Sequence, residues 1–176
     1  MPLLQVDAVS GRPVLRGGGD LVAALRLALA ARPPGAPVVV MIHGYRFSPF
    51  DPHRCPHDHI LSLRPRRGCW KAISLPRHLG FGRGRADEGL CIAFGWDAGG
   101  TIWRAWNSAA RAGAALAGLI ALAGGTRPSP VDLVCHSLGA RVALSAFPAL
   151  PGRSMGRVVL MAAAELRGSA AAALAP

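Results

Sequence analysis

Short apolar runs alternate with helix-like segments along most of the chain, and this alternation constrains the fold more than any other feature. The first run, PVVVMI at residues 37–42, is rich in β-branched residues and stops at His43 and Gly44, which is typical of a strand buried on both faces. Similar runs follow at residues 90–96, 131–135 and 157–163. Helical patterns occupy residues 20–32, 101–123 and 138–147. Because parallel strands need crossover connections, and helices usually provide them, this order predicts an α/β fold with a mostly parallel sheet and helices on both faces.

The length and apolar content fit a single domain. The chain has 176 residues, of which 51% are hydrophobic, and a domain of this size buries enough surface to need no disulfide or metal for stability. Residues 46–88 are instead rich in Pro, Arg, His and Gly. We therefore expect one domain over residues 1–176, with a long loop or cap insertion at about residues 46–88.

The charge balance favours anionic partners without pointing to nucleic acid. The formal net charge is +11, from 20 basic and 9 acidic residues, but the arginines form no basic helix or aromatic-interleaved strand, so nucleic-acid binding is not expected. Residues 1–10 lack the features of a secretory signal. The most apolar stretch, residues 109–125, contains Arg111 and is shorter than the roughly 20 residues that span a bilayer. We expect a cytoplasmic protein without a membrane span, and the sequence does not indicate an oligomeric state.

A serine lies between a predicted strand and a predicted helix, in the sequence CHSLGAR at residues 135–141. A nucleophile elbow needs this arrangement, because a sharp strand-to-helix turn lifts the serine hydroxyl above the sheet and bulky neighbours would collide with the adjacent strand and helix. Gly139 meets the demand for a small residue, and Cys135 approaches it. The other interpretation of Ser137 is an N-cap on an ordinary strand-to-helix turn.

The sequence HGY at residues 43–45 supplies a second part of the same chemistry. Acyl transfer needs two backbone N–H donors near the developing oxyanion, one from the residue after the nucleophile and one from the loop after an earlier strand. Leu138 and Tyr45 occupy these two positions. An apolar strand ending in HGY, then a strand and a helix, then CHSLGAR, resembles the α/β-hydrolase superfamily, in its esterase and lipase-like branch, over residues 37–165.

This resemblance implies a serine hydrolase that cleaves a carboxylic ester or related acyl bond of a small-molecule substrate. It implies that Ser137 is the nucleophile and forms an acyl-serine intermediate, that the N–H groups of Tyr45 and Leu138 form the oxyanion hole, and that no cofactor or metal is required. Cys135 departs from the family pattern, which usually has Gly there, and we expect it to be a buried structural thiol. The residues expected against the substrate are His43, Gly44 and His136. We expect the His136 side chain to pack or hydrogen-bond rather than to act as the base.

The family's triad order, serine, then acid, then histidine, is met only in part. Glu165 is the sole acidic residue after Ser137 and is the candidate acid, the other interpretation being a charge at the start of a final helix. No histidine follows Ser137. Three explanations stay open: the chain lacks a C-terminal part beyond Pro176 that carries the histidine; His43 or His78 acts as an unusual base; or the protein has lost catalysis and keeps a binding cleft.

Histidine and cysteine alternate within the long connection. The residues concerned are His53, Cys55, His57 and His59, with Cys69 further along. A single run interrupted by prolines lacks the two separated ligand pairs of structural zinc sites, so we expect no metal, and a cytoplasmic setting disfavours a Cys55 to Cys69 disulfide. We hypothesise instead that this connection caps the mouth of the active site, where the side chains of Arg54, Arg64 and Trp70 would meet the substrate. For three other tryptophans we expect packing in the core or an interface: Trp96, Trp103 and Trp106.

Overall fold

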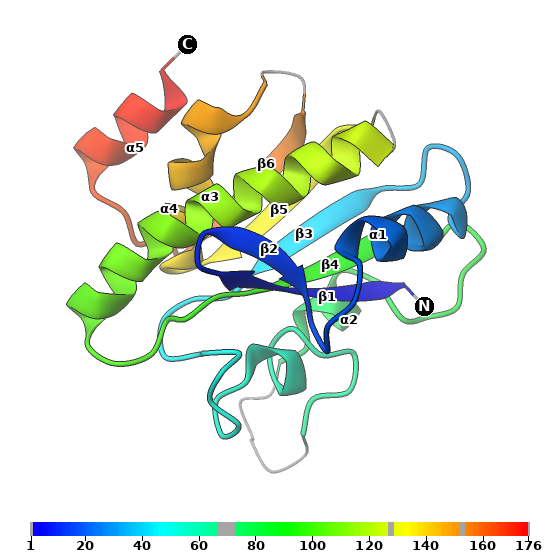
Figure 1. The fold of residues 1–176 in the computed structure, drawn as a ribbon, viewed down its shortest axis with the longest axis horizontal. Coiled ribbons are helices and arrows are strands. Elements are labelled where there is room, and N and C mark those ends of the chain that lie inside the picture. The colour runs from blue at the N-terminus through cyan, green and yellow to red at the C-terminus, as the bar shows by residue number, and fades with distance from the viewer. Residues whose placement is uncertain (1, 67–72, 127–128, 152–153, 176) are drawn as a thin grey trace.

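The computed structural model describes residues 2–66, 73–126, 129–151 and 154–175 (Figure 1). Cys69 and Trp70, named above as a disulfide partner and a cap residue, lie outside these ranges.

Within the described ranges, six strands form one mixed sheet in the order β2-β1-β4-β3-β5-β6. The strands are β1 Leu3–Val9, β2 Arg12–Leu15, β3 Val38–Ile42, β4 Leu90–Gly95, β5 Val131–His136 and β6 Met155–Met161. Strands β1, β4, β3, β5 and β6 pair in parallel, and β2 pairs antiparallel to β1. The predicted mostly parallel sheet is therefore confirmed, whereas the β1–β2 hairpin was not predicted.

Helices follow the strands much as the sequence pattern indicates. The longer ones are α1 Leu21–Ala30, α3 Ile102–Thr126, α4 Gly139–Ala146 and α5 Arg167–Leu174. Short helical turns are α2 Leu75–His78, η1 Pro56–Asp58 and η2 Phe147–Ala149. The Asp20 carboxylate caps α1 by accepting hydrogen bonds from the N–H groups of Val22 and Ala23.

The two faces of the sheet are covered in different ways. On one face, alternate strand residues such as Val40, Ile92 and Leu133 pack in a single core with α1, α3 and α4. On the other face, Met41 and Cys91 belong to a smaller core that is closed by residues of the long connection, namely Leu61, Leu75 and Phe81. We expected helices on both faces of the sheet. On the second face the described residues form only the short turns α2 and η1, because the proline-rich connection does not support long helices.

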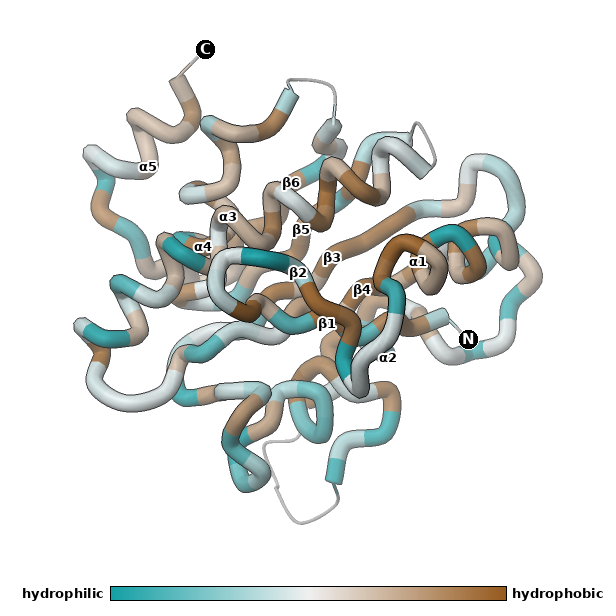
Figure 2. The backbone as a smooth tube through the Cα atoms, in the orientation of Figure 1, coloured by the Kyte–Doolittle hydropathy of each residue, from teal (hydrophilic) through white to brown (hydrophobic). Residues whose placement is uncertain are grey.

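The distribution of hydropathy follows this layering. Figure 2 shows hydrophobic residues along β3 and many hydrophilic residues in the connection between β3 and β4. The expected domain insertion at residues 46–88 corresponds to this connection, which reaches from the end of β3 to the start of β4.

Helix α3 is, by length and composition alone, able to cross a membrane, and half of its most apolar window is buried in the fold. It packs against α4 and β2, and Leu116, Leu119 and Ile120 are fully buried within it. These apolar residues therefore contribute to the core of the domain.

Candidate functional site

The register of the sheet brings several polar residues together at the carboxyl ends of the parallel strands. Ile42 pairs with both Phe94 and Cys135, so the next residues, His43, Gly95 and His136, stand at the same level on three adjacent strands. Asp7 of β1 pairs with Gly95 and extends the row. The HGY turn and the CHSLG turn therefore lie side by side at this edge, as the sequence predicts.

Ser137 occupies the turn between β5 and α4 in a strained backbone conformation. Its φ of +52° lies in the left-handed region, which residues other than glycine rarely adopt. Its N–H donates to the carbonyl of Met161 (2.9 Å), and its own carbonyl accepts from the N–H of Ala164 and Ala140 (3.1 Å each). The turn is thus held both by the end of β6 and by the start of α4, which maintains the strain.

The structure does not show the capping role that was the other interpretation of Ser137. Leu138 is the N-cap residue of α4 and makes no side-chain capping bond. Among the described residues, none forms a hydrogen bond with the Ser137 hydroxyl. A strained serine at a strand-to-helix turn, with an uncommitted hydroxyl, is typical of a nucleophile elbow.

Two glycines allow the close packing around this turn. A Cβ atom on Gly44 would lie 2.9 Å from the Cβ of Ser137 and 3.0 Å from the carbonyl oxygen of His136. A Cβ atom on Gly139 would lie 2.7 Å from the carbonyl oxygen of His43. Real Cβ atoms do not approach this closely, so both positions require glycine. The loop after β3 therefore lies directly against the serine turn.

Cys135 lies on the helix-covered face of the sheet and is fully buried. Burial raises the pKa of its thiol to about 12, and a thiol that stays protonated is a poor nucleophile. Cys135 is therefore a packing residue, as expected for the small residue two positions before Ser137.

The backbone N–H groups of Tyr45 and Leu138 donate no hydrogen bond to any residue that the structure describes. The loop that carries Tyr45 is fixed by its hydroxyl, which donates to the carbonyl of Gly100 (2.7 Å), and by Arg46 N–H, which donates to the carbonyl of Ala98 (3.0 Å). Two uncommitted N–H groups, one on each of two turns in contact, match the donor pair that an oxyanion requires.

His43 is fully buried and uses both of its ring nitrogens for structure. Nε2 accepts a hydrogen bond from the backbone N–H of Trp96 (3.1 Å), so the proton lies on Nδ1, which donates to the carbonyl of Gly44 (2.9 Å). The Trp96 indole stacks on the imidazole and donates to the His43 carbonyl (2.9 Å). Burial lowers the pKa of His43 to about 3. The neutral ring therefore positions the Gly44 loop, and it has no free nitrogen to serve as the base for Ser137.

His78, the other candidate base, lies near the opposite edge of the sheet. Its Nδ1 is 2.7 Å from the carbonyl oxygen of Ser74, and it lines a hollow with Arg77. Arg77 also lines a hollow with Pro2 and Glu88, which precede the parallel strands β1 and β4. The serine turn follows β5 at the carboxyl edge, so the structure opposes His78 as the base.

His136 ends β5 and packs beside the turn, with its Nδ1 3.1 Å from the position that a Cβ on Gly44 would take. It is half-buried. This contact agrees with the expected packing role.

Glu165 is bound to an arginine. Both of its carboxylate oxygens accept from Nη1 of Arg141 (2.9 and 2.8 Å), and one also accepts from the N–H of Leu166 (2.7 Å). The Arg141 guanidinium lies over the Trp106 ring, 3.9 Å from its centroid, and Nε donates to the Trp106 carbonyl (3.0 Å). Glu165 therefore joins the residues before α5 to α4 and α3. The N–H of its neighbour Ala164 donates to the Ser137 carbonyl, but the Glu165 carboxylate itself is held by Arg141.

Sequence reasoning missed a buried acid and histidine pair at the same edge. Nε2 of His57 lies 2.6 Å from Oδ1 of Asp7, and both residues are buried. The other oxygen of Asp7 pairs with Arg16, whose second nitrogen lies 3.1 Å from the Cys55 sulfur. Nδ1 of His57 has no partner among the described residues. Gly95 leaves room for this pair, because a Cβ atom at residue 95 would collide with both the Asp7 carboxylate and the His57 ring.

Arg64, a residue of the hypothesised cap, does not lie at the serine turn. Arg64 lines hollows with Pro2 and Leu3, near the start of β1, away from the serine turn, because the connection covers a face of the sheet. Within residues 2–66, 73–126, 129–151 and 154–175, no three His, Cys, Asp or Glu side chains are arranged to hold a metal ion. Trp103 is 73% exposed, so it does not pack in the core, and packing in an interface stays a prediction.

Comparisons of the chain with family models, with curated proteins and with solved structures found no match.

Proposed function

We propose that this chain is a serine hydrolase of the α/β-hydrolase type, in which Ser137 attacks a carboxylic ester or related acyl bond. The observation that carries the proposal is the left-handed conformation of Ser137 (φ +52°) at a strand-to-helix turn that is packed against Gly44. A strained serine costs stability, and such strain is concentrated at functional sites. The sheet supports the proposal, because the serine turn and the HGY turn follow neighbouring parallel strands.

In the proposed reaction, Ser137 Oγ forms a bond to the acyl carbon and the carbonyl oxygen becomes an oxyanion. The N–H groups of Tyr45 and Leu138 donate to this oxyanion, and removing one such donor typically costs roughly 100-fold to 1000-fold in rate. The bond between the acyl carbon and the alcohol oxygen then breaks, and the alcohol leaves with the proton that Ser137 gave up. Water adds to the acyl carbon, and the carboxylic acid leaves as the Ser137 hydroxyl is restored. No step requires a metal or cofactor.

The proton of the Ser137 hydroxyl needs an acceptor, since serine is a weak nucleophile without an adjacent base. His43 is neutral with both nitrogens engaged, and His78 lies near the other edge of the sheet. The described residues thus include the proposed nucleophile and the proposed oxyanion donors, but none of their histidines is bonded to Ser137. This observation favours a second candidate function, a binding protein that keeps the hydrolase fold and cleft without efficient catalysis.

Labelling with a fluorophosphonate probe distinguishes these functions. We expect the purified, folded chain to gain the mass of one probe at Ser137, and the Ser137→Ala variant to gain none. Ser145→Ala, which removes a half-buried hydroxyl from α4, is the matched control and should label like the unaltered chain. A folded chain that does not react would contradict an activated Ser137 and leave the binding function as the better explanation.

A further inference from the structure

We propose that a hollow beside α3 is a binding site for a small anionic molecule with a flat apolar part, such as an aromatic carboxylate. The hollow has a volume of about 300 Å³ and does not include Ser137. Its walls come from four segments that meet at the carboxyl edge of the sheet: the β1–β2 turn, the loop after β3, the loop after β4 and α3. The residues that the argument uses are Ser10, Phe50, Trp96, Asp97, Ser108 and Arg111.

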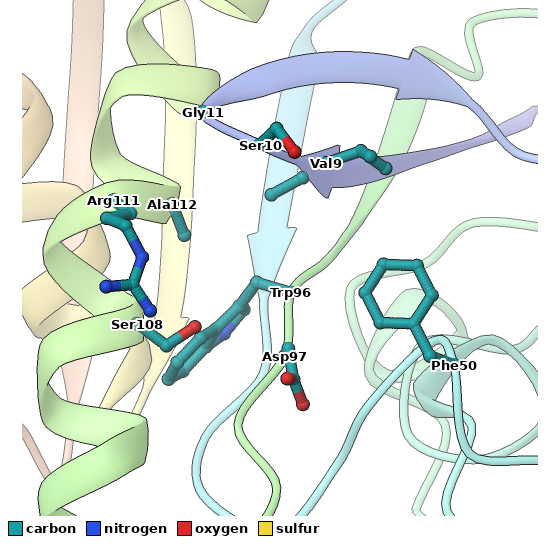
Figure 3. Close-up of a pocket in the computed structure, with 10 residues that line it drawn as sticks. Val9, Ser10, Gly11, Phe50, Trp96, Asp97, Ser108, Arg111 and Ala112 are labelled. Atoms are coloured by element: carbon teal, nitrogen blue, oxygen red, sulfur yellow. The ribbon is translucent and has the colours of Figure 1, made fainter.

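The hollow contains one uncompensated positive charge. Arg111 makes no hydrogen bond or ion pair with any residue that the structure describes. Arg111 is exposed and lines the hollow, and Figure 3 shows its side chain running along α3 toward Ser108. An arginine at the wall of a hollow, without an acidic partner of its own, favours a carboxylate, sulfonate or phosphate as a ligand.

The negative charge at the rim is already paired and does not cancel Arg111. Oδ2 of Asp97 lies 2.6 Å from Nη2 of Arg104, and Oδ1 accepts from the N–H of Gly99 (3.2 Å). Burial alone would raise the pKa of Asp97, but hydrogen bonds from Ser48, Gly99 and Arg104 outweigh it and lower this pKa. Asp97 is therefore ionised and bound to Arg104, which leaves Arg111 as the charge available to a ligand.

The rest of the hollow offers an aromatic surface and hydroxyl groups. Phe50 is 60% exposed and stands across the hollow from α3 (Figure 3), while the fully buried Trp96 closes the hollow from below and leaves Phe50 as the accessible ring. Exposed aromatic rings bind flat apolar groups by stacking. The Ser10 and Ser108 hydroxyls form no hydrogen bond with the described residues, so both can donate to a bound anion. A ligand with one anionic group and one aromatic ring matches this combination.

Benzoate and its neutral isostere benzamide test the proposal by NMR titration of the full chain. We expect benzoate to shift, saturably, the amide signals of Phe50, Ser108 and Arg111. Benzamide should bind at least roughly tenfold more weakly, since it cannot form the charge-assisted hydrogen bonds with Arg111. Similar affinities for the two probes, or shifts located elsewhere, would overturn the proposal.

The variant Arg111→Ala should weaken benzoate binding roughly tenfold or more and leave benzamide binding unchanged. Arg26→Ala is the matched control, because it removes another exposed arginine from a helix, α1, and it should not alter benzoate binding. If Arg111→Ala keeps the native circular dichroism and the original benzoate affinity, the hollow is not the benzoate site. Ser137→Ala should bind benzoate normally, so the outcome is independent of whether the chain is a hydrolase.

Discussion

At the scale of single residues, Ser137 combines strain with contact between two turns. Its left-handed backbone is maintained by hydrogen bonds to Met161, Ala164 and Ala140. Gly44 lies against its side chain and permits no Cβ. The Ser137 backbone therefore cannot leave the left-handed region, or move away from the HGY loop, without breaking its hydrogen bonds to Met161, Ala164 and Ala140.

This strain predicts an order of stability between two variants that both lack the hydroxyl. Ser137→Gly should be about 1 kcal/mol more stable than Ser137→Ala. Alanine in the left-handed conformation costs roughly 1–2 kcal/mol, which glycine avoids. Glycine also increases the conformational entropy of the unfolded chain, which reduces this advantage. At Ser145, within α4, the order should reverse by about 1 kcal/mol, because alanine favours the helix. Urea unfolding of the four variants measures both differences. A Ser137→Ala variant as stable as Ser137→Gly would contradict strain at this turn.

At the scale of elements, the connection between β3 and β4 is a layer of the fold. Leu61, Leu75 and Phe81 close the second core on the sheet. The buried contact between His57 in η1 and Asp7 in β1 fastens the first part of this layer to the carboxyl ends of the strands. The position of η1 therefore depends on a polar pair as well as on apolar packing.

Removing this polar pair should loosen η1 more than the rest of the domain. Asp7→Ala leaves both His57 nitrogens without a protein partner, and an unsatisfied buried group costs roughly 1–3 kcal/mol. We expect faster hydrogen exchange at the amides of Asp58 and Leu61 and a matching loss of unfolding free energy. Asp87→Ala removes one partner of an exposed ion pair with Arg85; it is the control and should change neither. Unaltered exchange at η1 in Asp7→Ala would show that apolar contacts suffice.

At the scale of the whole molecule, stability should fall as the medium becomes acidic, and His43 is a principal cause. Its pKa is about 3 in the folded chain because of burial and 6.5 in the unfolded chain. Between these values the unfolded state binds the proton and the folded state does not, so the stabilisation is complete above pH 6.5 and declines as the pH falls toward 3.

The pH dependence of unfolding free energy tests this cause. His43 should contribute a slope of up to about 1.4 kcal/mol per pH unit between pH 4 and 6. His43→Asn should be less stable at neutral pH and show a shallower slope. His53→Asn, which replaces an exposed histidine, should keep the original slope. Equal slopes in His43→Asn and the unaltered chain would assign the acid sensitivity to other groups.

The sequence predicts the central parts of the fold because those parts are locally encoded. Strands β3 and β4 are continuous apolar runs, β5 is apolar except for Asp132 and His136, and Asp20 marks the start of α1. Strand β1 was missed although Leu4 and Val6 alternate with Gln5 and Asp7, a period of two that indicates a half-buried strand. Strand β2 has only four residues, including Pro13, which is too short and irregular to predict.

The candidate site was predictable where it follows strand ends and unpredictable where it joins distant loops. His43, Gly44 and Ser137 come directly after apolar runs, and parallel strands bring such positions to one edge. The pairing of Asp7 with His57 spans fifty residues and an irregular connection, so no periodic signal indicates it. Likewise, the position of Arg64 near the start of β1 depends on how the connection lies across the sheet.

The location of β6 has a consequence for behaviour at high concentration. It is the last strand of the described sheet, and Val159 is 48% exposed on it. An outer strand of this kind offers its backbone to a strand of another molecule, which is the usual starting point of aggregation. Arg157, at 85% side-chain exposure while paired with Asp132, places a charge on this edge. A charge on an outer strand is one of the features that disfavour such edge-to-edge pairing.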